Sequence, residues 1–257
     1  MRRLLIALVA LLPLAGQAGP SVGQVFKTGG DVEVFRSGRT LSSSAGDIEV
    51  FRNGQLAPAA PGSAVEVGDV FVTGPGQAAA LRMSDDQTIS LGASSRFQVV
   101  SYRFDSQDRA GNHARYRLES GSARMISGLI SKQRSGSVVL ETAYGEVTTV
   151  GTDYIVGICD VACESPGFYI SVNAGSVTVS GDGVSQTASM GQIIFIAAAG
   201  GSPVLVASLP SGFLPAPDPA VIILSAIIPG STLRLDVAGP ICDGEASPTT
   251  PECTASR

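Results

Sequence analysis

Tryptophan is absent from this chain of 257 residues, histidine occurs once, and aromatic residues make up only 5% of the sequence. A serine triad would have to use His113, the single histidine. A zinc site is also disfavoured, because the four cysteines lack the C-x-x-C spacing of zinc knuckles. The sequence therefore predicts no catalytic residue, no metal site and no cofactor, and we interpret the protein as a non-enzyme.

Basic clusters and long apolar runs are missing as well. The formal net charge is −5, and loss of a leader containing Arg2 and Arg3 would leave 15 basic and 22 acidic residues, a charge of −7. Nucleic acid is therefore a poor partner, since its binding depends on clustered Lys and Arg. The apolar runs Leu4–Leu14 and Ala220–Ile228 are shorter than the roughly 20 residues that a transmembrane helix needs. We expect no transmembrane helix in the mature chain.

The first 18 residues have the pattern of an export signal. Arg2 and Arg3 precede an apolar core, and Gly16-Gln17-Ala18 resembles a small-residue cleavage site. We therefore expect cleavage near Ala18 and a periplasmic or secreted mature protein.

Cysteines in an exported protein favour disulfides. Three residues separate Cys159 from Cys163, and ten separate Cys242 from Cys253. The local pairings 159–163 and 242–253 are the economical prediction, and the cross-pairings stay open.

Glycine, by contrast, is abundant, with 31 residues, and β-branched residues crowd the central stretch Glu141–Ile158. Its alternation indicates two short β runs that meet at Gly151-Thr152. Alternating apolar and polar residues recur along the rest of the chain, separated by turn signals. We predict an all-β fold of antiparallel hairpins packed as a β-sandwich or β-roll, with no helix beyond the signal peptide.

An internal repeat lies near the N-terminus. The segment Gly30–Arg39 recurs sixteen residues later as Gly46–Gln55, and each copy is predicted to be a strand feeding a hairpin. Two copies are too few to indicate a solenoid.

Three further segments give local predictions. Asp85-Asp86 separates two alternating runs and is predicted to be a hairpin corner, because Asp tolerates left-handed backbone. The segment Ala114–Ile130 is predicted to be a strand pair that turns at Glu119–Gly121. Gly128–Gly136 is predicted to be a basic loop.

A set of glycine, threonine and acidic residues then appears in one order that resembles the FecR domain, an extracytoplasmic module named after the ferric-citrate regulator. Its members in this sequence are Gly68, Asp69, Thr73, Gly74, Asp85, Gly145, Gly151, Thr152, Gly175, Gly191 and Gln192. The family usually has Asp-Gly at the first hairpin corner, where this chain has Asp86. These residues are turn and strand positions that build the scaffold, so the resemblance implies no binding residue.

The regulators that name the family carry a cytoplasmic anti-sigma segment and a membrane helix before this module. Here a cleavable signal stands in their place, so the resemblance implies a freestanding periplasmic or secreted form. The predicted division is 1–18 signal peptide, 19–64 N-terminal strands with the duplication, 65–198 FecR-like β domain, 199–219 Pro/Gly-rich linker, and 220–257 C-terminal hairpin and loose tail.

Two functions follow as hypotheses. The first is a non-catalytic binding or sensing module that contacts a protein or cell-envelope partner. The alternative is a structural or adhesive surface protein that assembles by β-strand addition, for which the segment 220–237 is the candidate edge.

Overall fold

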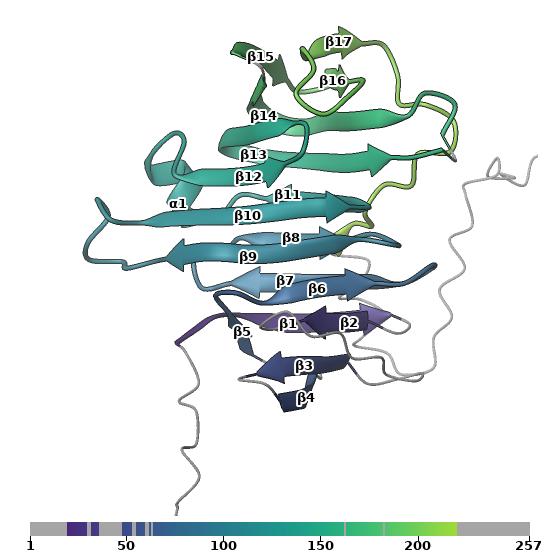
Figure 1. The fold of residues 1–257 in the computed structure, drawn as a ribbon. Helices are drawn as coiled ribbons and strands as arrows, with labels where there is room; N and C mark the ends of the chain where they lie inside the picture. The colour runs from purple at the N-terminus through teal and green to yellow at the C-terminus, as the bar shows by residue number, and fades with distance from the viewer. Residues whose placement is uncertain are drawn as a thin grey trace, which may run out of the picture.

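The computed structural model describes residues 20–219, apart from 30–31, 36–47, 53–54, 60–61, 63, 162 and 182. Seventeen β-strands and one short helix make up this part of the chain (Figure 1). The predicted all-β fold is confirmed. The predicted signal peptide and the predicted C-terminal hairpin and tail, with Cys242 and Cys253, lie outside the described residues.

The strands form one sheet that curls over on itself, so that two strips of strands face each other. Strip A contains, in pairing order, β5 (Ala64–Glu66), β1 (Ser21–Gly29), β7 (Ala78–Met83), β8 (Thr88–Leu91), β11 (Ser122–Ile126), the second part of β13 (Gly145–Cys159), the first part of β14 (Gly167–Gly181), β16 (Ile193–Ile196) and β17 (Val204–Val206).

Strip B contains β4 (Gln55–Ala59), β3 (Ile48–Arg52), β2 (Val32–Phe35), β6 (Val70–Thr73), β9 (Arg96–Arg103), β10 (His113–Ser120), β12 (Val138–Thr142), the first part of β13, the second part of β14, and β15 (Val184–Ser189). Figure 1 shows β6, β9, β10 and β12 in front of β7, β8 and β11.

The long strands β13 and β14 join the strips because each passes from one to the other. Their pairing register shifts between Val150 and Asp153, where the crossing occurs. Gly151 and Gly175 have φ angles of 60° and 77°, which favour glycine. A Cβ added at Gly175 would lie 2.5 Å from the carbonyl oxygen of Gly151. The two predicted β runs that meet at Gly151-Thr152 are thus one strand with a bend at this dipeptide.

The hydrophobic core lies between the strips, because alternation along each strand sends every second side chain inward. Strip A contributes fully buried aliphatic residues such as Leu81, Ile89 and Val156, and strip B contributes Phe97 and Tyr116. The Phe97 and Tyr116 rings stack at 5.4 Å between centroids. Burial of these side chains is the main stabilising contribution to the fold.

The strands predicted within Ala114–Ile130 exist, but they do not pair with each other. The structure pairs β10 with β9 and β12, and β11 with β8 and β13. Gly121, with φ 74°, carries the chain from strip B to strip A instead of closing a hairpin. In addition, β10 and β12 run parallel, as do β2 and β3, so the sheet is mixed rather than purely antiparallel.

One short helix corrects the prediction that no helix follows the signal peptide. Helix α1 (Leu129–Gln133) lies where the sequence predicts a basic loop. Its Ile130 side chain is fully buried in the core. The main-chain carbonyl of Asp85 accepts the Leu129 amide at 2.7 Å, which fixes the start of the helix. Five residues are too few to show helical periodicity in the sequence.

The two copies of the N-terminal repeat lie side by side. In the parallel pair β2 and β3, Glu33 is opposite Glu49 and Val34 is opposite Val50, so equivalent repeat positions pair. The second copy continues into the antiparallel pair β3 and β4, as predicted. Among the described residues, no helix has the length and hydrophobicity needed to cross a bilayer.

Candidate functional site

Both motif threonines hold neighbouring strip crossings together. The Thr73 hydroxyl donates to the carbonyl of Gly92 at 2.5 Å and accepts the Ser95 amide at 2.8 Å. The Thr152 hydroxyl donates to the carbonyl of Ser176 at 2.9 Å. Each threonine therefore satisfies main-chain groups that a crossing removes from the strand ladder.

Both motif aspartates are buried and hold turns. Asp69 accepts the Glu66 amide at 2.8 Å. Asp85 accepts the Tyr102 hydroxyl at 2.9 Å and the Ile130 amide at 3.1 Å, so it joins the β7–β8 corner to α1. Burial, followed by the neighbouring Asp85 charge, raises the pKa of Tyr102.

The predicted corner at Asp85-Asp86 lies at the turn between β7 and β8, and Asp86 has the left-handed φ of 64°. Asp86 therefore adopts the backbone conformation that glycine would adopt at the same place.

The remaining motif residues also lie at turns. Gly145 and Gly191 have positive φ, Gln192 accepts the Ser189 amide at 2.8 Å through its side chain, and the Gly74 amide donates to Gln77. Because the motif side chains are used within the scaffold, a binding site has to be made by residues outside the motif.

A small aromatic cluster lies on the outer face of strip A, beside a disulfide. Cys159 and Cys163 are bonded, with their Cα atoms 5.8 Å apart, so the predicted local pairing 159–163 is confirmed. Both cysteines pack with Tyr169, whose ring lies 4.6 Å from Phe195 and 5.9 Å from Phe213. Burial raises the pKa of Tyr169.

The segment 207–219, which we call the strap, crosses the outer face of strip A. In Figure 1 it is the yellow-green trace that leaves β17 and runs toward β8. Ala216 is only 3% exposed, and the Pro217 carbonyl accepts the Ser90 hydroxyl at 2.6 Å. The sequence favours a linker over 199–219, but here β17 belongs to strip A and the strap packs on the sheet.

An ion-pair cluster anchors the end of the strap. Arg124 donates to both carboxylate oxygens of Asp153, at 2.9 and 2.8 Å, and to Asp218 at 2.8 Å. Its side chain is 17% exposed. Hydrogen bonding to Asp153 is the main cause of the raised pKa of the Arg124 guanidinium. Asp153 thus orients the guanidinium that Asp218 contacts.

A hollow of about 300 Å³ opens where the strap meets the disulfide loop. Its lining includes Gly121, Ser122, Cys163, Phe213 and Leu214. The Leu214 side chain is 69% exposed. Arg124 lies two residues after the lining residue Ser122 on β11, so its shielded guanidinium is on the same face of the sheet as this largely apolar hollow. Such a surface is suited to hold an extended chain.

The family model described as FecR protein matches residues 69–178. The resemblance to the FecR domain is thus confirmed over residues 69–178. Two solved structures, at 1.65 and 2.50 Å, of a candidate anti-sigma factor from Parabacteroides distasonis resemble the chain with a TM-score of 0.41 and 14% identity. Each likeness covers 53% of this chain and 58% of that one. No curated protein matches the chain.

The described chain extends beyond the matched FecR domain on both sides. Strands β16 and β17 and the strap all follow residue 178. Sequence reasoning missed the strap because its four prolines and single glycine are typical of linkers. Phe213, an aromatic residue within this stretch, was the one signal of a packed segment.

His113 is the remaining candidate from the sequence. His113 is exposed at the start of β10, and its Nδ1 lies 3.0 Å from the Gly111 carbonyl oxygen. Within the described ranges, no three His, Cys, Asp or Glu side chains gather to hold a metal ion.

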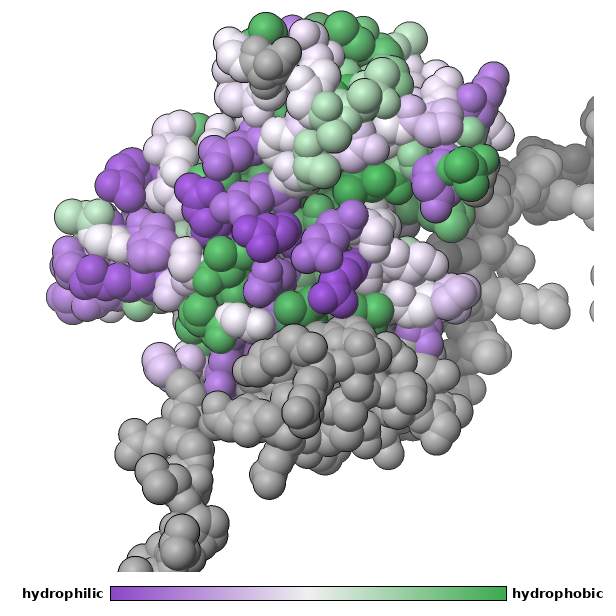
Figure 2. Space-filling model, viewed as in Figure 1, coloured by the Kyte–Doolittle hydropathy of each residue, from purple (hydrophilic) through white to green (hydrophobic). Residues whose placement is uncertain are grey.

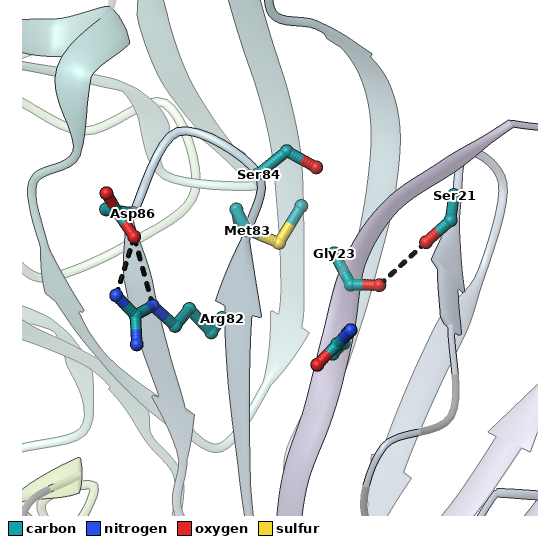
Figure 3. A pocket seen from close by; sticks show the side chains of 7 residues that line it. Ser21, Gly23, Arg82, Met83, Ser84 and Asp86 are labelled. Atoms are coloured by element: carbon teal, nitrogen blue, oxygen red, sulfur yellow. Dashed lines mark hydrogen bonds and ion pairs between the residues drawn. The ribbon is translucent and has the colours of Figure 1, made fainter.

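Figure 3 shows a second hollow, of about 350 Å³, between β1 and β7. Its charged residues, Arg82 and Asp86, pair at 2.6 Å and are 53% and 65% exposed, so water screens both of them. We assign this hollow no role.

The outer face of strip B carries a ladder of paired charges, visible as the hydrophilic surface in the centre of Figure 2. Arg115 contacts Glu141 and Glu146, and Arg117 contacts Glu141. Hydrogen bonds from Arg115 are the largest cause of the lowered pKa of Glu141. Because these positive and negative side chains pair with each other, this face attracts neither a strongly positive nor a strongly negative partner.

Proposed function

We propose that this protein is a non-catalytic binding or sensing module that acts outside the cytoplasm through a protein or cell-envelope partner. The observation that carries the proposal is the hollow where the strap meets the disulfide loop on strip A. Its lining is largely apolar and contains none of the motif residues, and the shielded guanidinium of Arg124 lies on the same face of β11 as the lining residue Ser122. The disulfide between Cys159 and Cys163 supports an oxidising compartment.

The FecR match supports a role in signalling or regulation rather than in catalysis. The motif aspartates and threonines are engaged in turn and crossing hydrogen bonds, so they are not poised for proton transfer. The division of the chain into N-terminal strands, a FecR domain and a C-terminal extension is part of the same proposal.

Affinity capture from an envelope extract tests this function. The full chain serves as bait, beside Ala93→Asp, which places a charge in the lining of the hollow outside the strap, and Val67→Asp, a half-exposed control on the turn before β6. We expect wild type and Val67→Asp to retain the same partner and Ala93→Asp to lose it. A bait truncated before Ala220 shows whether the C-terminal segment is needed. Equal capture by both aspartate variants would place the partner elsewhere.

One observation favours the alternative, assembly by strand addition. In the described part of the chain, β15 and β17 each pair on one side only, and Val184, Val204 and Leu205 are 46%, 49% and 47% exposed there. A sheet edge with apolar side chains can accept a further strand. Light scattering across a concentration series, with Val204→Lys as the variant, separates the two functions, because only assembly predicts growth that the lysine blocks.

A further inference from the structure

The strap is held differently from the strands beside it. Two of its main-chain carbonyls accept hydrogen bonds from the sheet side, Ser211 from the Glu164 amide at 3.1 Å and Pro217 from the Ser90 hydroxyl at 2.6 Å. The prolines of the strap, at 210, 215, 217 and 219, have no amide to donate. The strap is therefore held by a few separate main-chain and side-chain contacts rather than by continuous pairing with the sheet.

Small residues shape the surface beneath the strap into a trough. A Cβ on Gly157 would lie 2.6 Å from the Phe213 ring, and a Cβ on Gly92 would lie 3.2 Å from the Cα of Ala216. The ring and the main chain of the strap thus occupy space that any side chain at these two glycines would fill. The trough is a feature of strip A and not of the strap.

One polar group in the trough is not satisfied by the strap. Ser122 is 2% exposed, and its hydroxyl oxygen has no hydrogen-bond partner among the described residues. It lies beside Gly92, the position that the main chain of Ala216 covers. A buried hydroxyl without a partner costs free energy that a better-matched segment would recover.

We propose that this trough is the binding site of an extended, proline-containing segment of a partner protein, and that the strap is an internal competitor for the same site. This inference rests on the proposed function. The partner segment carries an aromatic ring for the Gly157 position, a small polar side chain opposite Ser122, and a carboxylate for Arg124. These are the features of the strap, with the Ala216 methyl replaced by a hydrogen-bonding group.

Hydrogen exchange on the full chain tests whether the strap opens on its own. Asp218→Asn removes the carboxylate that pairs with Arg124, and Glu119→Gln is the control, since it weakens an ion pair with Arg96 on strip B. An ion pair of this exposure corresponds to up to about a fivefold change in an opening equilibrium. We expect exchange in residues 207–219 to rise several-fold in Asp218→Asn only. Exchange of the strap at the same rate as β13 would overturn the proposal.

Peptide binding tests the chemistry of the trough. A labelled peptide of residues 207–219 is titrated into wild type, Asp218→Asn and Glu119→Gln, and we expect the tightest binding to Asp218→Asn because its trough is vacated most often. The same peptide with Ala216→Ser should bind about threefold to tenfold more tightly, the gain of one hydrogen bond. Ser122→Ala in the protein should abolish that gain and leave the binding of the unmodified peptide in place.

The outcomes separate this inference from the proposed function. If a captured partner is not displaced by the peptide, the trough assignment is wrong although the binding function stands. If the peptide binds as described and no partner is captured, the proposed function fails. If Asp218→Asn instead forms dimers that the peptide dissociates, the occupant is the strap of a second copy, which overturns the assignment to a partner protein.

Discussion

The crossing of β13 and β14 between the strips gives the sharpest test of the fold. Gly151 and Gly175 both have positive φ, but their surroundings differ. A Cβ on Gly151 would meet nothing within 4 Å, whereas one on Gly175 would lie 2.5 Å from the Gly151 oxygen and 3.1 Å from the Thr152 Cα. The two alanine variants therefore share the backbone penalty, and only Gly175→Ala adds a clash with main-chain atoms.

The magnitudes follow from these two terms. Left-handed backbone costs a residue with a Cβ about 1–2 kcal/mol. Alanine also lowers the conformational entropy of the unfolded chain, which stabilises both variants equally by about 0.4–1 kcal/mol. Forcing a methyl group into packed structure adds about 1–3 kcal/mol. We therefore expect Gly151→Ala to lose about 1 kcal/mol and Gly175→Ala to lose about 1–3 kcal/mol more.

Urea unfolding of both variants, followed by far-UV circular dichroism, measures the difference. The midpoint should fall in both, further for Gly175→Ala, while the denaturant slope stays unchanged because the same surface is exposed on unfolding. Gly183→Ala, at a positive-φ glycine with open space around it, is the control for the backbone term. Equal losses for Gly151→Ala and Gly175→Ala would refute the close stacking of the two strands at the crossing.

Three further predictions concern other parts of the molecule. Asp85→Asn should destabilise by about 1–3 kcal/mol, because an amide nitrogen replaces one acceptor in a buried cluster of donors, and thermal unfolding measures the loss. The pKa of Glu141 is lowered by Arg115. The stabilisation that ionised Glu141 contributes is therefore present above its ordinary pKa of 4.5 and is lost as the pH falls through its lower pKa in the folded protein. In a plot of unfolding free energy against pH, Glu141→Gln should therefore lose less stability on acidification than wild type. Replacing Cys159 and Cys163 together with serine should lower the free energy of unfolding by less than roughly 3 kcal/mol, the value for a disulfide that closes a 15-residue loop. Urea unfolding of the double variant measures the loss, and a loss above that value would contradict the prediction.

The sequence predicts the strands of this fold better than their partners. Alternation along a strand records which face is buried, and it places β10 and β11 correctly on either side of Gly121. This alternation does not show which strands pair with one another. Whether Gly121 closes a hairpin or carries the chain between strips depends on contacts with Ser94 and Ser95, more than twenty residues earlier. Long-range contacts of this kind are absent from a local pattern.

The candidate site could not be predicted from the sequence for a different reason. Pro, Gly and Ser in the strap are typical of linkers, and their composition gives no sign of a trough elsewhere in the chain. The trough is made by Gly92 and Gly157, which lie 65 residues apart in the sequence and meet only after β8 and β13 join strip A. Small residues that form a cavity wall look, in sequence, the same as small residues at a turn.

The motif residues of this chain and the surface residues that a partner could contact are different sets. The motif residues of this chain fix turns and crossings, so another chain that keeps them keeps the scaffold whatever it binds. The groups that the proposal assigns to a partner are others, namely Arg124 and Ser122 on the outer face of strip A. The strap, which follows the matched range 69–178, competes for the same trough under that proposal. A chimera that exchanges residues 207–219 should therefore change the affinity for the partner, but neither the identity of the partner nor the fold.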